Sequence, residues 1–340
     1  MNDAPHWTEP GAYPVAEGIH RIPLPLPMDG LRAVNVYAIE SEDGLTLVDG
    51  GWAIDESRRR LDEALGSIGH RTSDITRVLV THMHRDHYTQ ALTIRREFGS
   101  HVSLGIGEKA SLGVVQDERD SSDPTLTVIR RTGADRVARG WEKAMSGGDK
   151  PDVSLYADPD AWLDDGQRLT VGTRTLDAVA TPGHTQGHLV FADLASGLLF
   201  AGDHVLPTIT PSIGFEPAQA DQPLGDFLAS LAKVRAMPDL RLLPAHGAVT
   251  ASTHTRIDEL VAHHDERLAL CLASVITGRH TAYDVAVDLP WTRHARRMDD
   301  LDVFNAALAS METMAHLDLL AARGEITRSQ DGGVNEYGVV

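Results

Sequence analysis

Short apolar runs alternate with segments of helical periodicity along most of the chain, and glycine, proline or aspartate stands at the breaks between them. In the N-terminal part, strands are predicted at 19–22, 33–39, 45–48, 78–80 and 101–104. The spacing of leucine, alanine and isoleucine predicts helices at 54–68 and 89–98, and each of them ends at a glycine. This alternation predicts a layered α/β core.

The pattern changes between residues 105 and 166. Polar breaks separate three predicted helices, at 108–116, 124–131 and 134–145. This segment is also the most basic part of the chain, through Arg130, Arg131, Arg136, Arg139 and Lys143. Two interpretations stay open: a solvated helical face, or a helical lid whose cations hold an anionic substrate.

Strands return in the second half and are predicted at 169–171, 175–180, 189–192, 198–201 and 240–243, with a helix at 221–236. From residue 255 the composition becomes helical again. The predicted helices there are 256–276, 282–289 and 303–323, and a small β-wing follows at 326–340. These changes divide the chain into one domain at 1–254, which contains the insertion at 105–166, and a second domain at 255–340.

A dense set of metal-type ligands follows the predicted strand at 78–80. Within six residues lie His82, His84, Asp86 and His87. Imidazole and carboxylate are usual ligands of a catalytic zinc or iron that keeps one coordination position open. In an extended segment, His82 and His84 point to the same side and can reach one ion, whereas a turn can direct Asp86 and His87 to a second ion.

The same arrangement recurs further along the chain. His184, Asp203 and His246 each follow an apolar strand and precede a turning or glycine-containing segment. Strand ends that each supply a metal-type ligand suggest a single site at a shared edge of packed sheets. Asp49, which ends the strand at 45–48, either orients a ligating imidazole or simply begins a turn.

Charge and cysteine content narrow the possible functions. The 340 residues carry a formal net charge of −18, which argues against an extended basic surface for nucleic acid or an anionic membrane. The single cysteine, Cys271, cannot form an internal disulfide, as is usual in a reducing cytosol. The N-terminal residues lack an apolar signal core, and no apolar run reaches membrane-spanning length. We therefore expect a cytoplasmic protein.

The ligand pattern resembles that of the metallo-β-lactamase fold superfamily over about residues 15–250. The strings Thr181-Pro182-Gly183-His184-Thr185-x-Gly187-His188 and Gly202-Asp203 are most similar to the glyoxalase II branch. The resemblance implies an αββα sandwich with the site at one edge. It further implies that His82, His84 and His184 hold one ion, that Asp86, His87 and His246 hold the other, and that Asp203 bridges the two. His188 is expected to support the site rather than to ligate.

Departures from related families restrict the chemistry. The β-lactamases of this fold use a cysteine near the position of Asp203, whereas Cys271 lies far downstream. Antibiotic hydrolysis is therefore not expected. His84 stands where flavodiiron-type members carry an acidic residue. The full set of seven donors favours two ions over the single iron of persulfide dioxygenases.

The C-terminal order of three helices and a wing resembles the winged-helix-like tail of the β-lactamase-like-protein branch, in which some members resemble endoribonucleases and others acyl-carrier thioesterases. Acidic residues crowd the third helix, which favours packing or dimerisation over DNA binding: Asp299, Asp300, Asp302, Glu312 and Asp318. His263, His264 and His316 are expected to be surface or core residues rather than ligands.

These features predict a hydrolase with two divalent ions, for which zinc is favoured and iron or manganese are alternatives. A hydroxide bridging the ions would be the nucleophile, because metal binding lowers the pKa of water from about 16 to about 7. Asp86 would ligate and orient it. His204, beside Asp203, is either a proton donor to the leaving group or an ordinary strand-end polar residue.

The expected substrate is a small anionic thioester or related activated acyl compound, such as an acyl-CoA or glutathione thioester. A phosphodiesterase or endoribonuclease, a lactonase, and a binding protein that uses the tail remain as alternatives. No nucleic-acid or membrane partner is expected, and a homodimer is left open.

Overall fold

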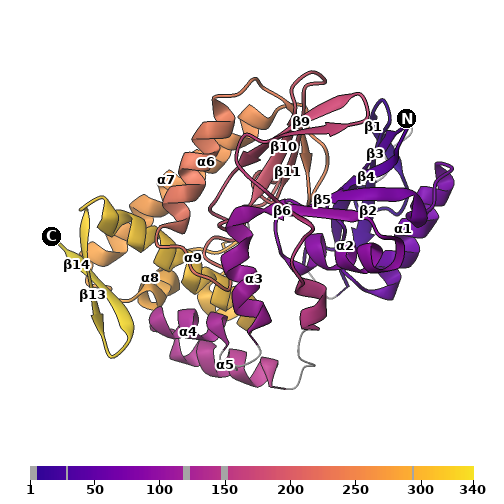
Figure 1. Ribbon diagram of the computed structural model, residues 1–340. Coiled ribbons are helices and arrows are strands. Elements are labelled where there is room, and N and C mark those ends of the chain that lie inside the picture. The colour runs from indigo at the N-terminus through magenta and orange to yellow at the C-terminus, as the bar shows by residue number, and fades with distance from the viewer. Residues whose placement is uncertain (1–5, 28–29, 118–122, 147–151, 293–294) are drawn as a thin grey trace.

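The computed structural model describes residues 6–27, 30–117, 123–146, 152–292 and 295–340. Two sheets form its centre (Figure 1). The first has seven strands in sequence order: β1 Tyr13–Ala16, β2 Ile19–Pro25, β3 Ala33–Ser41, β4 Gly44–Val48, β5 Ile75–Leu79, β6 His101–Gly105 and β7 Ala161–Leu163. The second has the order β12-β11-β10-β9-β8: β8 Arg168–Val171, β9 Arg174–Ala180, β10 Leu189–Asp193, β11 Leu198–Gly202 and β12 Arg241–Pro244.

The alternation of side chains along each strand separates three apolar layers. Along β10, Leu189 and Phe191 face the first sheet, whereas Val190 and Ala192 face the opposite way. The outer face of the first sheet packs against α1 Asp55–Ser67 and α2 Arg85–Phe98, and the outer face of the second packs against α6 Pro223–Arg235 and α7 Thr253–Ile276. The architecture is therefore the αββα sandwich that the resemblance implies.

Two element boundaries near the ligand motif differ from the sequence prediction. Strand β5 ends at Leu79, so His82 and His84 lie in a loop rather than on a strand. Helix α2 begins at Arg85, not at residue 89, and its first turn includes Asp86 and His87. Apolar periodicity could not detect this turn because its residues are polar and are placed by the site. A carboxylate such as Asp86 is also favourable at a helix N-terminus.

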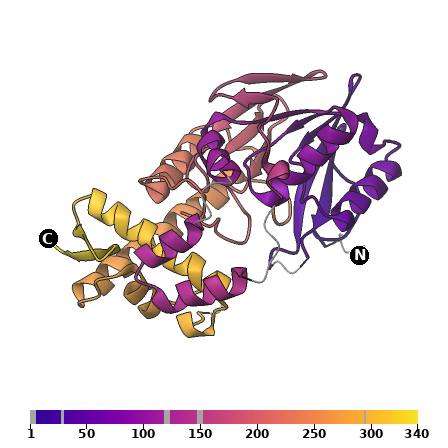
Figure 2. The same ribbon diagram turned by 60° about the horizontal axis from the view of Figure 1, so that its bottom comes forward.

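The segment at 105–166 is not wholly helical. It contains α3 Lys109–Gln116, α4 Pro124–Arg131 and α5 Asp135–Met145, but also strand β7 at the edge of the first sheet. Helices α4 and α5 lie beside the C-terminal helices in both views (Figures 1 and 2). Val128, Ile129 and Trp141 share a core with those helices. A lid movement of α4 and α5 would have to open this core, and it stays a prediction.

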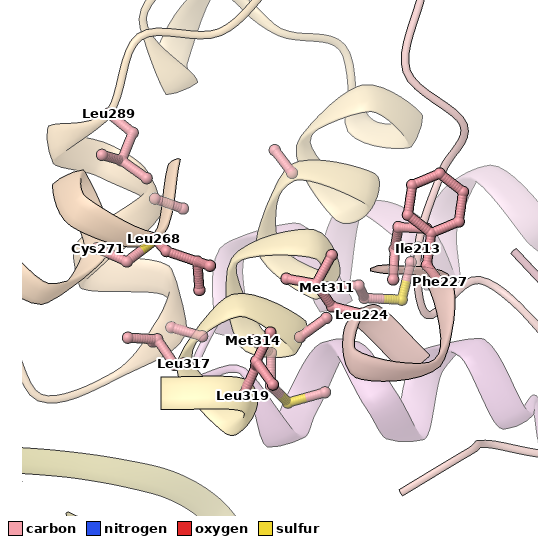
Figure 3. Close-up of a cluster of buried hydrophobic side chains, with 14 of the residues drawn as sticks. Ile213, Leu224, Phe227, Leu268, Cys271, Leu289, Met311, Met314, Leu317 and Leu319 are labelled. Carbon is pink, nitrogen blue, oxygen red and sulfur yellow. The ribbon is translucent and has the colours of Figure 1, made fainter. Parts of the chain in front are cut away.

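The C-terminal region has the predicted order: α7, α8 Ala282–Asp288, α9 Val303–Ala322, then the hairpin of β13 Ile326–Asp331 and β14 Val334–Val339. Helix α9 is buried on most of its surface, as its apolar composition requires. Figure 3 shows Leu317 of α9 in the same apolar cluster as Leu268 and Cys271 of α7. A recognition helix has to be exposed, so the burial of α9 favours the packing role, which stays a prediction. No helix in the described ranges is long and apolar enough to cross a membrane.

Candidate metal centre

All seven predicted donors meet at one edge of the sandwich. His82 and His84 come from the β5–α2 loop, and Asp86 and His87 come from the first turn of α2. The second sheet supplies the other three: His184 follows β9, Asp203 follows β11 and His246 follows β12. The parallel pairs β4–β5 and β11–β12 carry their C-terminal ends to this edge.

Three imidazoles form the first group of donors. His82 Nε2 and His184 Nε2 each lie 3.0 Å from His84 Nδ1. His82 is fully buried and His184 nearly so, and the three ligand atoms lie within 4.8 Å of one another. These distances are slightly shorter than the roughly 3.3 Å between neighbouring nitrogens around a tetrahedral zinc with Zn–N bonds of about 2.0–2.1 Å.

Asp86, His87 and His246 form the second group. Asp86 Oδ2 lies 3.6 Å from His87 Nε2 and 3.5 Å from His246 Nε2. Asp203 lies between the groups: its Oδ1 is 3.3 Å from His246 Nε2, and its Oδ2 is 3.6 Å from His184 Nε2. One carboxylate thus faces both groups, as a bridging ligand would.

The ring nitrogens that face away from the two groups lie against backbone carbonyl oxygens. His184 Nδ1 donates to the Ser212 carbonyl at 2.7 Å, and His246 Nδ1 donates to the Ala33 carbonyl at 2.8 Å. His84 Nε2 lies 3.3 Å from the Phe215 carbonyl. A nitrogen that donates outward leaves the other ring nitrogen with its lone pair directed inward, which is the usual arrangement of metal-ligating histidines.

Asp49 performs the same task for His87. Its Oδ2 lies 2.9 Å from His87 Nδ1, and its Oδ1 accepts the Thr81 backbone N–H at 2.8 Å. The residue is buried and has a positive φ of 63°, a conformation that costs energy for aspartate. Of the two interpretations of Asp49, the structure supports the orienting one.

Protonation differs between the two groups. Burial, and then the neighbouring His184, lowers the pKa of His84 to about 3. Burial also lowers the pKa of His87, but the charges of Asp49, Asp86 and Asp203 outweigh it and raise that pKa to about 10. Burial opposes the low pKa of Asp203, and the charges of His246 and His87 overcome it. In the protein without metal, protons therefore occupy the second group, and an ion would have to displace them.

His188 contacts the backbone of Asp203, in keeping with the supporting role that the resemblance implies. The Asp203 backbone N–H donates to His188 Nε2 at 3.1 Å, and His188 Nδ1 lies 2.9 Å from Thr181 Oγ1. Gly202 precedes Asp203 with a φ of +50°, and a Cβ there would lie 2.7 Å from His188 Nε2. Only glycine fits this close approach.

His204 is placed less favourably for proton donation. Its ring is fully buried and packs against Phe227 at a centroid distance of 5.3 Å, and neither nitrogen has a hydrogen-bond partner among the described residues. Burial lowers its pKa to about 3, so the ring is neutral at pH 7 rather than a cationic acid. The proton-donor role stays a prediction, and this environment counts against it.

Two buried carboxyl groups that were not recognised from the sequence hold the loop of His184. Glu108 Oε1 accepts from Thr185 Oγ1, and Glu216 Oε2 accepts the Gln186 backbone N–H at 3.0 Å. Burial raises the pKa of Glu108 to about 8 and that of Glu216 to about 7. Neither residue follows a strand or lies in a motif, so no local signal marked them.

The donor set fits divalent ions. Within the described residues, the buried atoms His87 Nε2, His246 Nε2 and Asp203 Oδ1 make no hydrogen bond, although ion-pair distances of 3.7 and 3.3 Å separate the two nitrogens from the oxygen. Buried polar atoms rarely remain unpaired. An ion at each group would satisfy them, and mixed imidazole and carboxylate ligands suit zinc, iron or manganese.

Comparison with known proteins agrees with this geometry. The family model of the metallo-beta-lactamase superfamily matches residues 29–246. The chain is 25% identical to the "Probable metallo-hydrolase YqjP" of Bacillus subtilis, across 92% of this chain and 94% of that relative. It is 29% identical to the "Beta-lactamase-like protein 2 homolog" of Caenorhabditis elegans, but there the match spans only 38% of this chain and 43% of the relative.

A solved structure of a metallo-beta-lactamase family protein from Thermus thermophilus is similar over 96% of this chain and 100% of that chain, with a TM-score of 0.75 and 26% identity. The similarity thus includes the C-terminal helices as well as the sandwich. The fold, the donor set and the family match lead to the same conclusion: this chain belongs to the metallo-beta-lactamase superfamily and is a metal-dependent hydrolase.

Proposed function

We propose that the protein is a two-ion hydrolase of thioesters or related activated acyl compounds. The observation that carries the proposal is the position of Asp203 between two complete groups of donors, with one oxygen toward each. The second group, Asp86, His87 and His246, has the donors to hold an ion of its own. Zinc is the favoured ion, with iron or manganese as alternatives.

The chain's own residues would fix the ions and orient the reactants. Two divalent ions, when bound, supply Lewis acidity and lower the pKa of a water ligand toward neutrality. His82, His84 and His184 would hold one ion, and Asp86, His87 and His246 the other. The side chain of Asp86 is 14% exposed, whereas that of His87 is fully buried. Asp86 therefore faces the side from which substrate and water arrive, where its carboxylate can orient a water and accept its proton.

An apolar wall beside the first group supports an acyl substrate. The ring of Phe215 lies 6.2 Å from that of His84, and Phe304 lies 5.6 Å from Phe215. Trp141 stacks on Phe304 at 6.0 Å, and Phe304 is 45% exposed. This row of rings leads from the donor group to the surface and suits the hydrocarbon part of an acyl compound.

Ion pairs occupy some of the basic side chains of α4 and α5 and so leave fewer of them to bind an anionic substrate. Arg130 pairs with Glu142 and Arg136 pairs with Asp299. Arg131 instead lines a cavity of about 140 Å³, together with Arg328 and Asp318. Gly214 also lines this cavity and is the residue before Phe215. If the substrate carries an anionic group, Arg131 is the residue of this segment best placed to receive it. The net charge of −18 still opposes a polynucleotide substrate.

The test is turnover of the zinc-loaded protein on an acyl-CoA thioester and on single-stranded RNA, side by side. We expect thioester turnover, and a loss of at least about 100-fold in Asp86→Asn, because even residues that only support a ligand commonly contribute 10- to 100-fold. Asp258→Asn is the matched control, since Asp258 is an exposed partner of Arg235 far along the chain.

RNA cleavage that disappears in Asp86→Asn would overturn the substrate assignment in favour of an endoribonuclease. Turnover of a lactone but of no thioester would move the assignment to the lactonases. Equal thioester turnover in Asp86→Asn and the wild type would refute the role given to this carboxylate.

A further inference from the structure

A second cluster of ligand-type side chains lies away from the seven donors, in the interface between α7 and α9. His264 of α7 meets Glu312 and His316 of α9, and one ligand atom from each residue lies within 4.8 Å of the other two. Glu312 and His316 are four residues apart, so they share one face of α9. From the sequence, His264 and His316 are expected to be surface or core residues, and both are buried.

Hydrogen bonding fixes the state of His316. Its Nδ1 lies 2.7 Å from the Glu312 backbone carbonyl, which can only accept, so Nδ1 carries the hydrogen. The Nε2 lone pair of His316 then points at His264, whose Nδ1 is 3.1 Å away. This is the arrangement found at the main centre, where an imidazole donates outward to a carbonyl and offers its other nitrogen inward.

One ring nitrogen of the cluster has no hydrogen-bond partner among the residues that the structure describes. His264 is fully buried, and its Nε2 has no hydrogen-bond partner in the described parts of the chain. The Glu312 carboxylate lies beside the two rings and is partly buried. His264 Nδ1 donates to His316 Nε2 at 3.1 Å, close to the 3.0 Å between His82 Nε2 and His84 Nδ1, so an ion could bind between the two nitrogens if it displaced the His264 proton.

The charges around the cluster favour a cation between these three side chains. Burial lowers the pKa of both His264 and His316, so their rings are neutral and keep lone pairs for an ion. The nearby cation Arg267 opposes metal binding. However, its guanidinium is held over the Trp291 ring at 4.3 Å and donates to the Pro290 carbonyl at 2.9 Å. Burial raises the pKa of Glu312 and the charge of Arg267 opposes that rise, so an ion would bind as the carboxyl loses its proton and then supplies the negative charge.

We propose that His264, Glu312 and His316 form a separate structural site for a divalent, zinc-type ion that links α7 to α9. Two imidazoles and one carboxylate are a known zinc donor set, and a water or the second carboxylate oxygen can complete four-coordination. The ring of Phe227 lies between this cluster and the main centre, 5.5 Å from His264 and 5.3 Å from His204. The site is therefore distinct from the main centre and goes beyond the proposed hydrolysis.

The test is the zinc content of the full-length protein after metal removal, reloading with Zn²⁺ and dialysis, measured by mass spectrometry of the metal. We expect His316→Gln to hold one equivalent less than the wild type. His263→Gln is the matched control, because His263 is the neighbouring, partly exposed histidine on α7 and belongs to no donor group among the described residues. It is expected to retain the full content.

Glu312→Gln is the second variant, since it preserves side-chain size should His316→Gln fail to fold. Here we expect the additional equivalent to be lost at a free Zn²⁺ concentration at which the wild type retains it. A second measurement is the melting temperature, which zinc should raise less in either variant than in His263→Gln. Equal zinc content in the wild type and a folded variant would overturn the proposal and leave the two histidines as a hydrogen-bonded pair in the core.

Discussion

Asp49 shows how a residue that is no ligand contributes to the centre. Its carboxylate fixes the ring of His87 from one side and the Thr81 backbone from the other. The strained backbone of Asp49 is therefore maintained by two contacts that position a ligand. At this scale, support of the metal centre depends on single hydrogen bonds to buried rings.

Removal of this support should weaken metal binding without removing a ligand. In Asp49→Ala, His87 Nδ1 loses its acceptor, and we expect the affinity for Zn²⁺ to fall by roughly 10- to 100-fold. Competition with a chromophoric chelator measures the change. Asp193→Ala is the control. Asp193 is as buried as Asp49, but it pairs with Arg174 and lies at the C-terminal end of β10, whereas the His184 loop precedes the N-terminal end of that strand. An unchanged affinity in Asp49→Ala would contradict the orienting role.

Glu108 should make stability depend on pH. Its pKa is about 8 in the folded protein and near 4.5 when unfolded, so between these values the folded state binds more protons. The stabilising contribution of Glu108 should therefore be fully present below pH 4.5. It should decrease as the pH rises toward 8, by at most about 1.4 kcal/mol per pH unit. Glu108→Gln removes the contribution.

Urea unfolding of the wild type and Glu108→Gln at pH 5.5 and pH 7.5, both saturated with zinc, checks this sign. We expect the variant to gain stability relative to the wild type at the higher pH. Glu259→Gln, at an exposed ion pair with Arg256, should follow the wild type. Parallel pH profiles for wild type and Glu108→Gln would show that the buried carboxyl is ionised in the folded state.

At the scale of elements, the loop between β9 and β10 is built by close backbone contact with the segment after β6. A Cβ on Gly187 would lie 2.1 Å from the Glu108 backbone nitrogen. The loop can therefore approach only without a side chain, and this approach brings Thr185 to Glu108 and His184 to its place among the donors.

Gly187→Ala should consequently disturb both the fold and the centre. We expect a loss of roughly 1–3 kcal/mol or more in the free energy of unfolding, because backbone rather than a mobile side chain is in the way. Zinc content should fall with it. Gly113→Ala in α3 is the control: a Cβ there meets nothing within 4 Å, and a helical alanine should add about 0.5–1 kcal/mol. A gain of stability in Gly187→Ala would contradict the close contact.

At the scale of the whole molecule, the ions would join the two sheets. The first sheet and its following helix supply His82, His84, Asp86 and His87, and the second supplies His184, Asp203 and His246. Ligands from both halves converge across the apolar layer between the sheets. Binding of metal to the folded chain alone should therefore stabilise the sandwich as a unit.

Chelation should lower the melting temperature by roughly 5–10 °C, if zinc is present at about 1,000 times its dissociation constant. Differential scanning calorimetry with and without chelator measures the shift, and added zinc should restore it. The shift has to persist in His316→Gln, which leaves the main centre intact. An equal melting temperature with and without metal would show that the ions do not bridge the halves.

Much of this architecture was accessible from the sequence, because local patterns encode it. Alternating apolar positions predicted the strands of both sheets, and strand ends followed by histidine or aspartate predicted the donors now found together. The C-terminal order of helices and hairpin was also predicted. The winged-helix relationship, the glyoxalase II branch and the division into domains stay predictions.

Tertiary structure decided the contacts between segments that lie far apart in the chain. Examples are Glu108 with Thr185, α4 and α5 with α9, and His264 with His316. Each depends on how helices and loops pack, and packing is set by complementary shapes that no short window of sequence contains. The sequence by itself marked the seven side chains that the structure brings together at one edge of the sandwich. Only the folded chain determined which buried carboxyls and imidazoles came to lie beside one another.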